Sequence, residues 1–420
     1  MNNLNFLVDV LKESPVFKTL EKNVKPGRTV CASGLSTINK SNIIYALCRL
    51  KGVTAFCLAS DEKEAQTLCN DLSCMGLRAY VYPVRDFNFL DFQSRSHEYE
   101  HARLKVLLKL LNHECDVAIA CVDAAAQLTV PRNVLEQSVI EFEEGRELSL
   151  EKATKALTLL GYERFDAVEG SGQFSLRGGI LDFFMPDSDY PVRCEFWGDE
   201  ITDLSYFDIE TQRRFKKADK ITLSPSTEIV IEDRAALADK IEHKAKLLRS
   251  KNSAKAKEKL FSEAELIRSG AMIANADKFI NQIYDKPESL FDYLDRNTLV
   301  FASEFTAIQE RGKSMDFISN ETLMQGFEDG TLCRGFDRFA LTFNECTEFL
   351  QSHGTIVLEN FVHGSMPIKL SEIISFSTKQ LSAWGGSYKQ LKEDVDGLFT
   401  PESKGVIFAG TERAAKNLCD

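Results

Sequence analysis

Hydrophobic residues between positions 28 and 123 fall into short apolar runs that alternate with longer amphipathic segments. The short runs predict buried strands at 28–32, 53–59, 78–82 and 116–122. The longer segments predict helices at 40–50, 61–74 and 97–111. Because strand and helix alternate at this spacing, the pattern predicts a parallel sheet covered by helices.

Around Pro131 the pattern changes. A strand is predicted at 134–142 and a short helix at 149–160. The stretch 172–213 then alternates apolar and polar residues with the period of strands that bury one face. A turn signal at Trp197–Glu200 separates two of these runs. The region therefore predicts a small antiparallel sheet with arginines on its open face.

Further along the chain, helices are expected at 232–249 and 254–284. Strands at 298–302 and 354–358 are expected to return to the first sheet, and a new unit is expected from residue 371, with a helix at 381–398, a strand at 405–409 and a helix from 411. The predicted fold is α/β, a parallel-sheet lobe interrupted by an inserted α+β domain. The predicted domains are 1–128 and 218–370 for the lobe, 129–217 for the insertion, and 371–420 for a small α/β domain that we expect to be incomplete.

Composition narrows the class of protein. Of the 420 residues 44% are hydrophobic, which supports several cores without a metal or disulfide staple. The eleven cysteines form no CxxC or Cys/His cluster, which favours reduced thiols and a cytoplasmic protein. The sequence shows no signal-peptide pattern and no apolar run of the ~20 residues that a membrane helix needs. A net charge of −12 argues against duplex DNA as the main partner of this chain.

The segment Gly34–Ser41 has the frame of a phosphate-binding loop, G-x-x-x-x-G-K-[ST], between a strand and a helix. Such a loop directs backbone N–H groups at phosphates and supplies a lysine for the outer phosphates and a hydroxyl for Mg²⁺. Lys40 and Ser41 are present, but Asn39 replaces the last glycine, and its side chain should crowd the loop.

A nucleotide hydrolase also needs acidic residues at a strand end to hold Mg²⁺. The strand expected near 299–303 ends in Ser303 and Glu304, with Ser303 where an aspartate is required. The replacements at Asn39 and Ser303 are independent of each other. Together they favour an inherited loop that no longer binds its ligand, and they argue against a working nucleotide site.

One histidine pair, His97 and His101, has the i, i+4 spacing of a helical metal site. No third ligand is evident, and the neighbouring Glu98, Glu100 and Arg103 favour a solvated helix face instead. No metal site is predicted.

Three arginines, Arg164, Arg177 and Arg193, lie in segments of the inserted unit that should pack together. They could form ordinary surface ion pairs, which contribute little to stability. Exposed arginine beside aromatic residues is also the composition of protein-binding hot spots. The aromatics in these segments are Phe174, Phe184 and Trp197.

The runs FSLRGGILDFFMP, PVRCEFWGDEI and FDIETQRR resemble the inserted second domain of bacterial transcription-repair coupling factors (Mfd). They are similar, less closely, to the equivalent domain of the excision-repair protein UvrB. Flanking segments around Val122, Leu157 and Glu288 agree as well, so that the resemblance covers roughly residues 25–370. Beyond residue 370 it extends only to the layout.

The resemblance implies an N-terminal UvrB-like module that recruits UvrA, the damage-recognition ATPase, in transcription-coupled nucleotide excision repair. It implies UvrA contacts at Arg164 and Arg177, while Ser175 replaces a third family arginine. The residues that we expect at the same UvrA-binding surface are Phe174, Phe184 and Arg193.

The resemblance also implies that the lobe is a degenerate P-loop-type, RecA-like lobe and that this chain has no ATPase activity and no cofactor. In the full-length family protein, ATP and Mg²⁺ belong to a DNA-translocase motor, and RNA polymerase and duplex DNA bind outside this region. The alternative is an active ATP-dependent DNA helicase or UvrB-like damage verifier. That function needs the residues of the degenerate nucleotide loop to work, namely Gly34, Asn39, Lys40, Ser41, Ser303 and Glu304.

Overall fold

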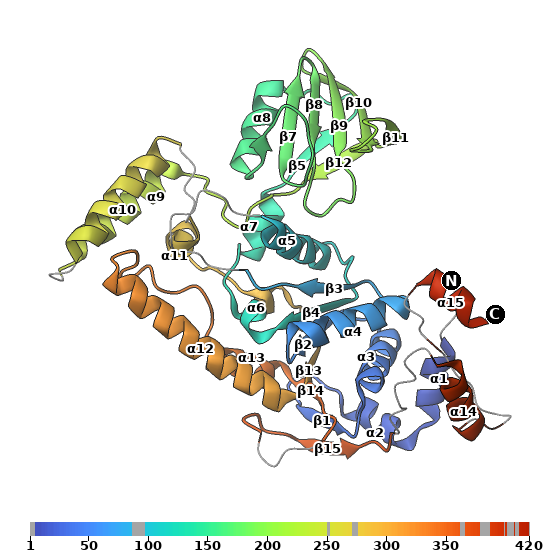
Figure 1. The fold of residues 1–420 in the computed structure, drawn as a ribbon. Helices are drawn as coiled ribbons and strands as arrows, with labels where there is room; N and C mark the ends of the chain where they lie inside the picture. Colours follow the sequence, from blue (N-terminus) through green and yellow to red (C-terminus); the bar gives the residue numbers. More distant parts are fainter. Residues whose placement is uncertain are drawn as a thin grey trace.

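The computed structural model describes residues 5–85, 97–249, 253–270, 276–361, 366–378, 387–398, 400, 407 and 411–419. A lobe built on a parallel sheet carries a separate β-rich domain, and a pair of helices lies to one side of both (Figure 1).

The lobe is organised around a seven-stranded sheet in the order β15-β1-β14-β13-β2-β4-β3, and all of its strand pairs are parallel. Its strands are β1 (Val30–Ser33), β2 (Ala55–Ala59), β3 (Ala79–Tyr82), β4 (Val117–Cys121), β13 (Leu299–Ser303), β14 (Thr355–Leu358) and β15 (Glu372–Ser375). Every residue of β1, β2, β4 and β14 is buried, as expected of strands covered on both faces. The predicted α/β fold with a parallel sheet is confirmed.

Side chains that alternate along these strands enter two separate cores. Cys31, Phe56 and Leu58 point into one core, and Val30, Ala55 and Cys57 point into the other. The second core is covered by α1 (Asn5–Glu13), α2 (Pro15–Asn23), α3 (Thr37–Lys51) and α4 (Glu62–Cys74). The first is covered by α5 (Glu98–Leu111), α6 (Val122–Ala126), the 3₁₀ helix η2 (Leu290–Tyr293), α12 (Phe305–Glu328) and α13 (Phe343–His353).

The β-rich domain contains a six-stranded sheet in the order β11-β10-β9-β8-β7-β6. Its strands are β6 (Glu163–Arg164), β7 (Gln173–Arg177), β8 (Ile180–Phe183), β9 (Val192–Trp197), β10 (Glu200–Phe207) and β11 (Arg214–Lys217). A two-stranded sheet of β5 (Ile140–Glu143) and β12 (Lys220–Leu223) packs with α8 (Leu150–Leu159) against its inner face around Phe142, Leu157 and Phe183. The antiparallel sheet expected from the alternating pattern is therefore present.

The remaining helices lie mostly on one flank of the lobe. They are α7 (Arg132–Gln137), α9 (Arg234–Leu247), α10 (Ser253–Arg268), the 3₁₀ helix η1 (Ala276–Phe279) and α11 (Ile280–Ile283), with α14 (Tyr388–Leu398) and α15 (Glu412–Cys419) nearer the end of the chain. In the described part of the chain, no helix is long and apolar enough to cross a membrane. All eleven cysteines are free.

Three predicted elements differ from the structure. Residues 132–137 form helix α7, so the strand predicted at 134–142 is reduced to β5. The single helix predicted at 254–284 is divided among α10, η1 and α11. The unit expected to begin at 371 starts instead with β15, which pairs with β1 at the edge of the parallel sheet. The strand predicted at 405–409 lies almost entirely outside the described residues, as does the first part of the helix predicted at 381–398.

Candidate partner-binding face and phosphate-loop-like segment

The backbone of the loop Gly34–Ser41, here called the Lys40 loop, is bonded to its own chain. The N–H of Gly34 donates to the carbonyl oxygen of Asn360 over 3.2 Å, and the N–H of Leu35 donates to that of Glu359 over 3.0 Å. Gly34 has φ +79°, and a Cβ there would overlap the carbonyl oxygen of Phe376. Two backbone amides at the start of the loop are thus already paired, and the segment after β15 lies against the loop.

The side chain of Lys40 is buried below the Lys40 loop. Its ammonium lies 2.5 Å from Glu304 Oε1, 2.9 Å from Ser303 Oγ and 3.3 Å from Glu64 Oε1, and its side chain is only 4% exposed. A phosphate-binding lysine has to present its charge to the ligand. Here Glu304 and Glu64, on β13–α12 and α4, neutralise it instead.

Ser41 and Asn39 also bond within the chain, and Ser41 points into the fold. Ser41 Oγ donates to Asp71 Oδ2 on α4 over 2.8 Å, and it is fully buried. Asn39 Nδ2 donates to Ser36 Oγ over 2.7 Å, which holds the start of α3. Burial raises the pKa of Asp71, against the hydrogen bond from Ser41. The serine hydroxyl that would coordinate Mg²⁺ in a working loop is therefore engaged with a carboxylate of the neighbouring helix.

A pair of carboxyl groups, Glu304 and Glu359, lies at the carboxyl ends of β13 and β14. Glu359 is fully buried, and its Oε1 accepts a hydrogen bond from the Phe305 amide over 2.8 Å. Burial raises the pKa of Glu359 to about 7, despite the Phe305 amide, and the charge of Glu304 adds to the rise. Glu304 itself has a left-handed backbone, φ 57° and ψ 65°, which is uncommon for a residue with a side chain.

On the outer face of the six-stranded sheet, Arg193 is locked in place by Asp182. Its guanidinium donates to both Asp182 oxygens, over 2.7 and 2.8 Å, and stacks 4.4 Å above the Phe207 ring. Arg193 is 13% exposed and Asp182 2%. The two side chains form a bidentate, largely buried ion pair. Arg193 therefore stabilises the sheet and exposes little of its side chain to a partner.

Arg177 shares the same carboxylate but remains accessible. One of its nitrogens donates to Asp182 Oδ2 over 2.9 Å, while 52% of its side chain is exposed. Arg164 on β6 is exposed and makes no side-chain hydrogen bond or ion pair with the described residues. Arg164 and Arg177, the two arginines that the resemblance singled out, thus present donors to solvent.

The other residues predicted for this surface are less accessible. Phe174 is 3% exposed and packs in the core of the inserted domain, so its side chain supports the sheet and does not reach the surface. Ser175 is 1% exposed and donates to the Asp166 carbonyl oxygen over 2.8 Å. Phe184 is half-buried. In their place the structure exposes Phe165 beside Arg164, and Trp197 at the tip of β9.

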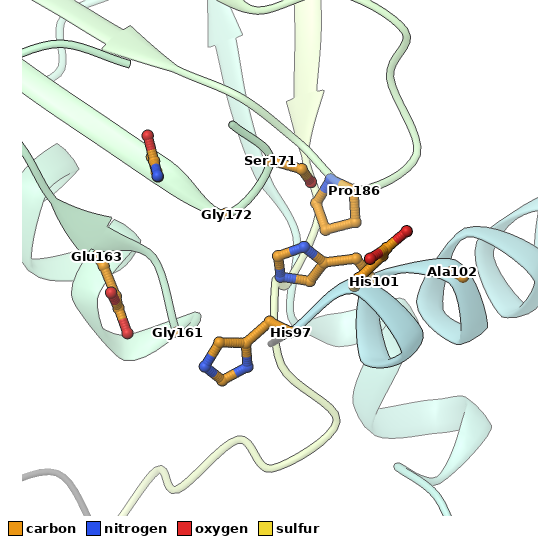
Figure 2. A pocket seen from close by; sticks show the side chains of 10 residues that line it. His97, His101, Ala102, Gly161, Glu163, Ser171, Gly172 and Pro186 are labelled. Carbon is orange, nitrogen blue, oxygen red and sulfur yellow. The ribbon is translucent and has the colours of Figure 1, made fainter. Parts of the chain in front are cut away.

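Figure 2 shows the cavity, of about 460 Å³, where the inserted domain meets the first turn of α5. His97 and His101 line it with stacked rings whose centroids are 5.9 Å apart, and Glu163 faces it from β6. Burial lowers the pKa of His101, which favours the neutral ring. Among the described residues, no three His, Cys, Asp or Glu side chains form a group that could hold a metal.

The helix face around this pair is only partly solvated: Glu98 is exposed, but Glu100 and Arg103 are buried, contrary to the sequence prediction. Arg103 is fully buried and bonded to both Glu228 oxygens, over 2.6 and 3.2 Å. Glu100 is also buried, and one of its oxygens accepts hydrogen bonds from Thr227 Oγ1 at 2.9 Å and from the Glu228 amide at 2.7 Å. Burial opposes ionisation of Glu100, but the hydrogen bond from His97 and the charge of Arg85 hold its pKa at about 2. These contacts hold the segment around Glu228, where the chain leaves the inserted domain, against α5.

Residues 140–229 match the family model of the UvrB interaction domain, which defines the class of the inserted domain. Arg164, Arg177, Asp182 and Arg193 all lie inside this match.

The chain as a whole is similar to transcription-repair-coupling factors. It is 26% identical to that of Bacillus subtilis (strain 168) over 416 residues, which are 96% of the chain and 35% of the relative. It is 24% identical over 359 residues to that of Staphylococcus epidermidis (strain ATCC 12228 / FDA PCI 1200), covering 81% of the chain and 29% of the relative. The factor of Staphylococcus aureus (strain MRSA252) is 21% identical over 426 residues, 99% of the chain and 36% of the relative. The chain thus spans about a third of the length of these relatives, and the resemblance found in the sequence is confirmed.

Proposed function

We propose that this chain is the N-terminal recruitment module of a transcription-repair coupling factor and that its inserted domain binds UvrA in the cytoplasm. The observation that carries the proposal is the UvrB-type interaction domain with Arg164 and Arg177 exposed on it. ATP-driven translocation on duplex DNA and binding of RNA polymerase are assigned, in the same proposal, to parts of such a protein outside this chain.

The arginines suit a partner that carries carboxylates. Both oxygens of Asp182 already accept hydrogen bonds from Arg193, and Arg177 donates only one bond to Asp182. The remaining N–H groups of Arg177 are therefore available to a second acceptor. Charged contacts of this kind accelerate association and make it salt-dependent, and removing one partner of a pair that becomes buried costs about 2–5 kcal/mol.

The proposal includes the loss of nucleotide chemistry in this chain. It is supported by the paired amides of Gly34 and Leu35, by the neutralised Lys40 and by Ser41 facing Asp71. No cofactor is therefore assigned to the chain. The competing function, an active helicase or damage verifier, would require all three elements to rearrange around a nucleotide.

A titration of immobilised UvrA with the purified chain tests the proposal. We expect saturable binding that weakens as salt is raised from 50 to about 300 mM, because exposed charges are screened. Absence of binding at low salt contradicts the recruitment function. A parallel titration with Mg-ATP should show no binding, and a micromolar dissociation constant would favour the helicase or verifier function instead.

A further inference from the structure

A cavity of about 690 Å³ lies outside the inserted domain, where the end of α12 meets the helical pair α9 and α10 (Figure 1). We call it the flank cavity. Its apolar wall comes from the end of α9 and the residue after it, from α10, from the last turn of α12 and from the loop that follows α12. The residues are Leu247, Leu248, Ala256, Phe327, Leu332 and Cys333. A cavity of this volume with a largely apolar wall is typical of a site for one small molecule.

The loop after α12 forms a fixed part of this wall. Gly330, with φ +69°, turns the chain after the helix, and the Leu332 N–H donates to the Gly326 carbonyl oxygen over 3.0 Å. Leu332 packs so closely on Gly326 that a Cβ at residue 326 would lie 2.7 Å from a Leu332 methyl carbon. At the other end of the loop, Lys244 Nζ donates to the Gly335 carbonyl oxygen over 3.3 Å. The wall is therefore preformed.

The charged side chains that line the flank cavity are all cationic: Lys244, Arg249 and Arg334. Arg249 and Arg334 are exposed, and neither forms an ion pair with the residues that the structure describes. Lys244 Nζ lies 5.3 Å above the Phe336 ring and donates to a carbonyl oxygen, so no described carboxylate neutralises it. The lining therefore presents three positive charges beside an apolar wall.

The carboxylates closest in sequence lie outside this lining. Asp329 accepts a hydrogen bond from Gln325 Nε2 over 2.9 Å, and Asp337 accepts one from the Gly335 N–H over 3.1 Å. Glu328 is exposed at the end of α12. Three other cavities of the described chain each include two carboxylates, namely Glu98 and Glu163, Asp116 and Asp295, and Glu232 and Asp233. The flank cavity differs from them in favouring an anion.

We propose that the flank cavity binds a small amphiphilic anion, that is, an acidic head group on an apolar body. The guanidinium groups of Arg249 and Arg334 form charge-assisted hydrogen bonds with the head group. The apolar body packs on Leu247, Phe327 and Leu332 and is removed from water. The inference is independent of UvrA binding, because the lining residues lie outside the UvrB-type domain at 140–229.

Displacement of a fluorescent fatty acid, dansyl-undecanoate, from the purified chain tests the proposal. Three competitors share one apolar chain and differ only in the head group: dodecanoate, dodecanol and dodecylammonium, each used below the concentration at which it forms micelles. We expect dodecanoate to compete with a micromolar inhibition constant and the other two about tenfold more weakly or less, since only the carboxylate complements the arginines. Failure of the probe to bind, or equal competition by all three, overturns the proposal.

Matched variants locate the site. Arg334→Glu and Leu247→Ser change exposed side chains of the flank cavity and should weaken dodecanoate about tenfold or more. Arg296→Glu and Val10→Ser make the same changes at exposed positions outside the cavity and should leave the affinity unchanged. Circular dichroism confirms that each variant is folded. If the two cavity variants bind dodecanoate as tightly as the native chain, the ligand binds elsewhere and the proposal is wrong.

Lipid vesicles separate a soluble ligand from a membrane surface. Phosphatidylglycerol vesicles offer anionic head groups, and phosphatidylcholine vesicles serve as the control without net charge. We expect the chain to remain in solution with both, because a cavity encloses a single molecule and does not lie flat on a bilayer. Sedimentation with phosphatidylglycerol vesicles by a chain that does not bind dodecanoate would assign the cations to a membrane surface and contradict the proposal.

Discussion

Lys40 donates to Glu304 over 2.5 Å, although the two residues are 264 positions apart in the chain. In a working nucleotide loop the lysine would point toward the phosphates, and a carboxylate at the end of the strand equivalent to β13 would bind Mg²⁺. Here the two groups neutralise each other. The pair forms an internal tie between α3 and the sheet.

The first prediction concerns this tie. Lys40→Met should lower the free energy of unfolding by about 2–4 kcal/mol, because Glu304 and Glu64 are left close together without their cation. The urea midpoint measures the loss. Adding Glu304→Gln to the variant should restore part of it, since one of the two carboxylates is then neutral. A single variant as stable as the native chain would show that the tie does not stabilise the fold.

The second prediction concerns nucleotide. Millimolar Mg-ATP should leave the melting temperature of the chain unchanged, because a ligand stabilises a protein only if it binds the native state. Calorimetry with and without Mg-ATP measures this. A ligand present at 100 times its dissociation constant would add about 2.7 kcal/mol, which is readily detected. Such a shift, lost in Lys40→Met, would mean that the loop opens to bind ATP.

The third prediction separates two arginines that share one carboxylate. Arg193→Ala should destabilise the domain by about 2–4 kcal/mol, because Asp182 is buried and keeps only one bond to Arg177. Arg177→Ala should change stability by less than about 0.5 kcal/mol, as is usual for exposed positions. Thermal unfolding of both variants checks the contrast. Equal losses would contradict the assignment of Arg193 as the supporting residue.

The fourth prediction is a pH dependence that arises from Glu359. Its pKa is raised to about 7 in the folded chain, so the folded state retains a proton that the unfolded state loses above its ordinary value near 4.5. Stability from this group is complete below pH 4.5 and is lost as pH rises to about 7, by about 1.4 kcal/mol for each unit of difference. His101, with a lowered pKa, acts in the opposite direction. The comparison is therefore between the native chain and Glu359→Gln.

Glu359→Gln keeps the site neutral at every pH. Its unfolding free energy, minus that of the native chain, should grow between pH 5 and 7.5 and stay constant above that range. Urea titrations at four or five pH values measure the difference. A difference that does not change with pH would show that Glu359 is ionised in the folded chain.

Much of the lobe could be predicted from the sequence because its strands and helices are encoded by local periodicity. The strand predicted at 134–142 was wrong in its first half, where residues 132–137 form α7. β15 was assigned to a new unit because nothing local indicates that it pairs with β1, more than 340 residues earlier. Pairing over such a distance depends on the tertiary fold.

The two candidate sites could be predicted only in part from the sequence. Asn39 and Ser303 stand where a nucleotide site needs glycine and aspartate, and from them the sequence predicts a loss of nucleotide binding. Glu64, Asp71 and Glu359, which now satisfy or flank the remnants, gave no signal, because their proximity exists only after folding. On the inserted sheet, strand alternation correctly separated Arg177 from the core, but it could not show that Asp182 shelters Arg193.

The most direct test of the recruitment function is the dissociation constant of UvrA for the double variant Arg164→Ala/Arg177→Ala. Arg146→Ala is the matched control, because Arg146 lies in the same domain and its side chain is 49% exposed, against 52% for Arg177. We predict at least a tenfold weaker complex for the double variant, with unchanged melting temperature, and native affinity for Arg146→Ala. Native affinity in the double variant would contradict the account.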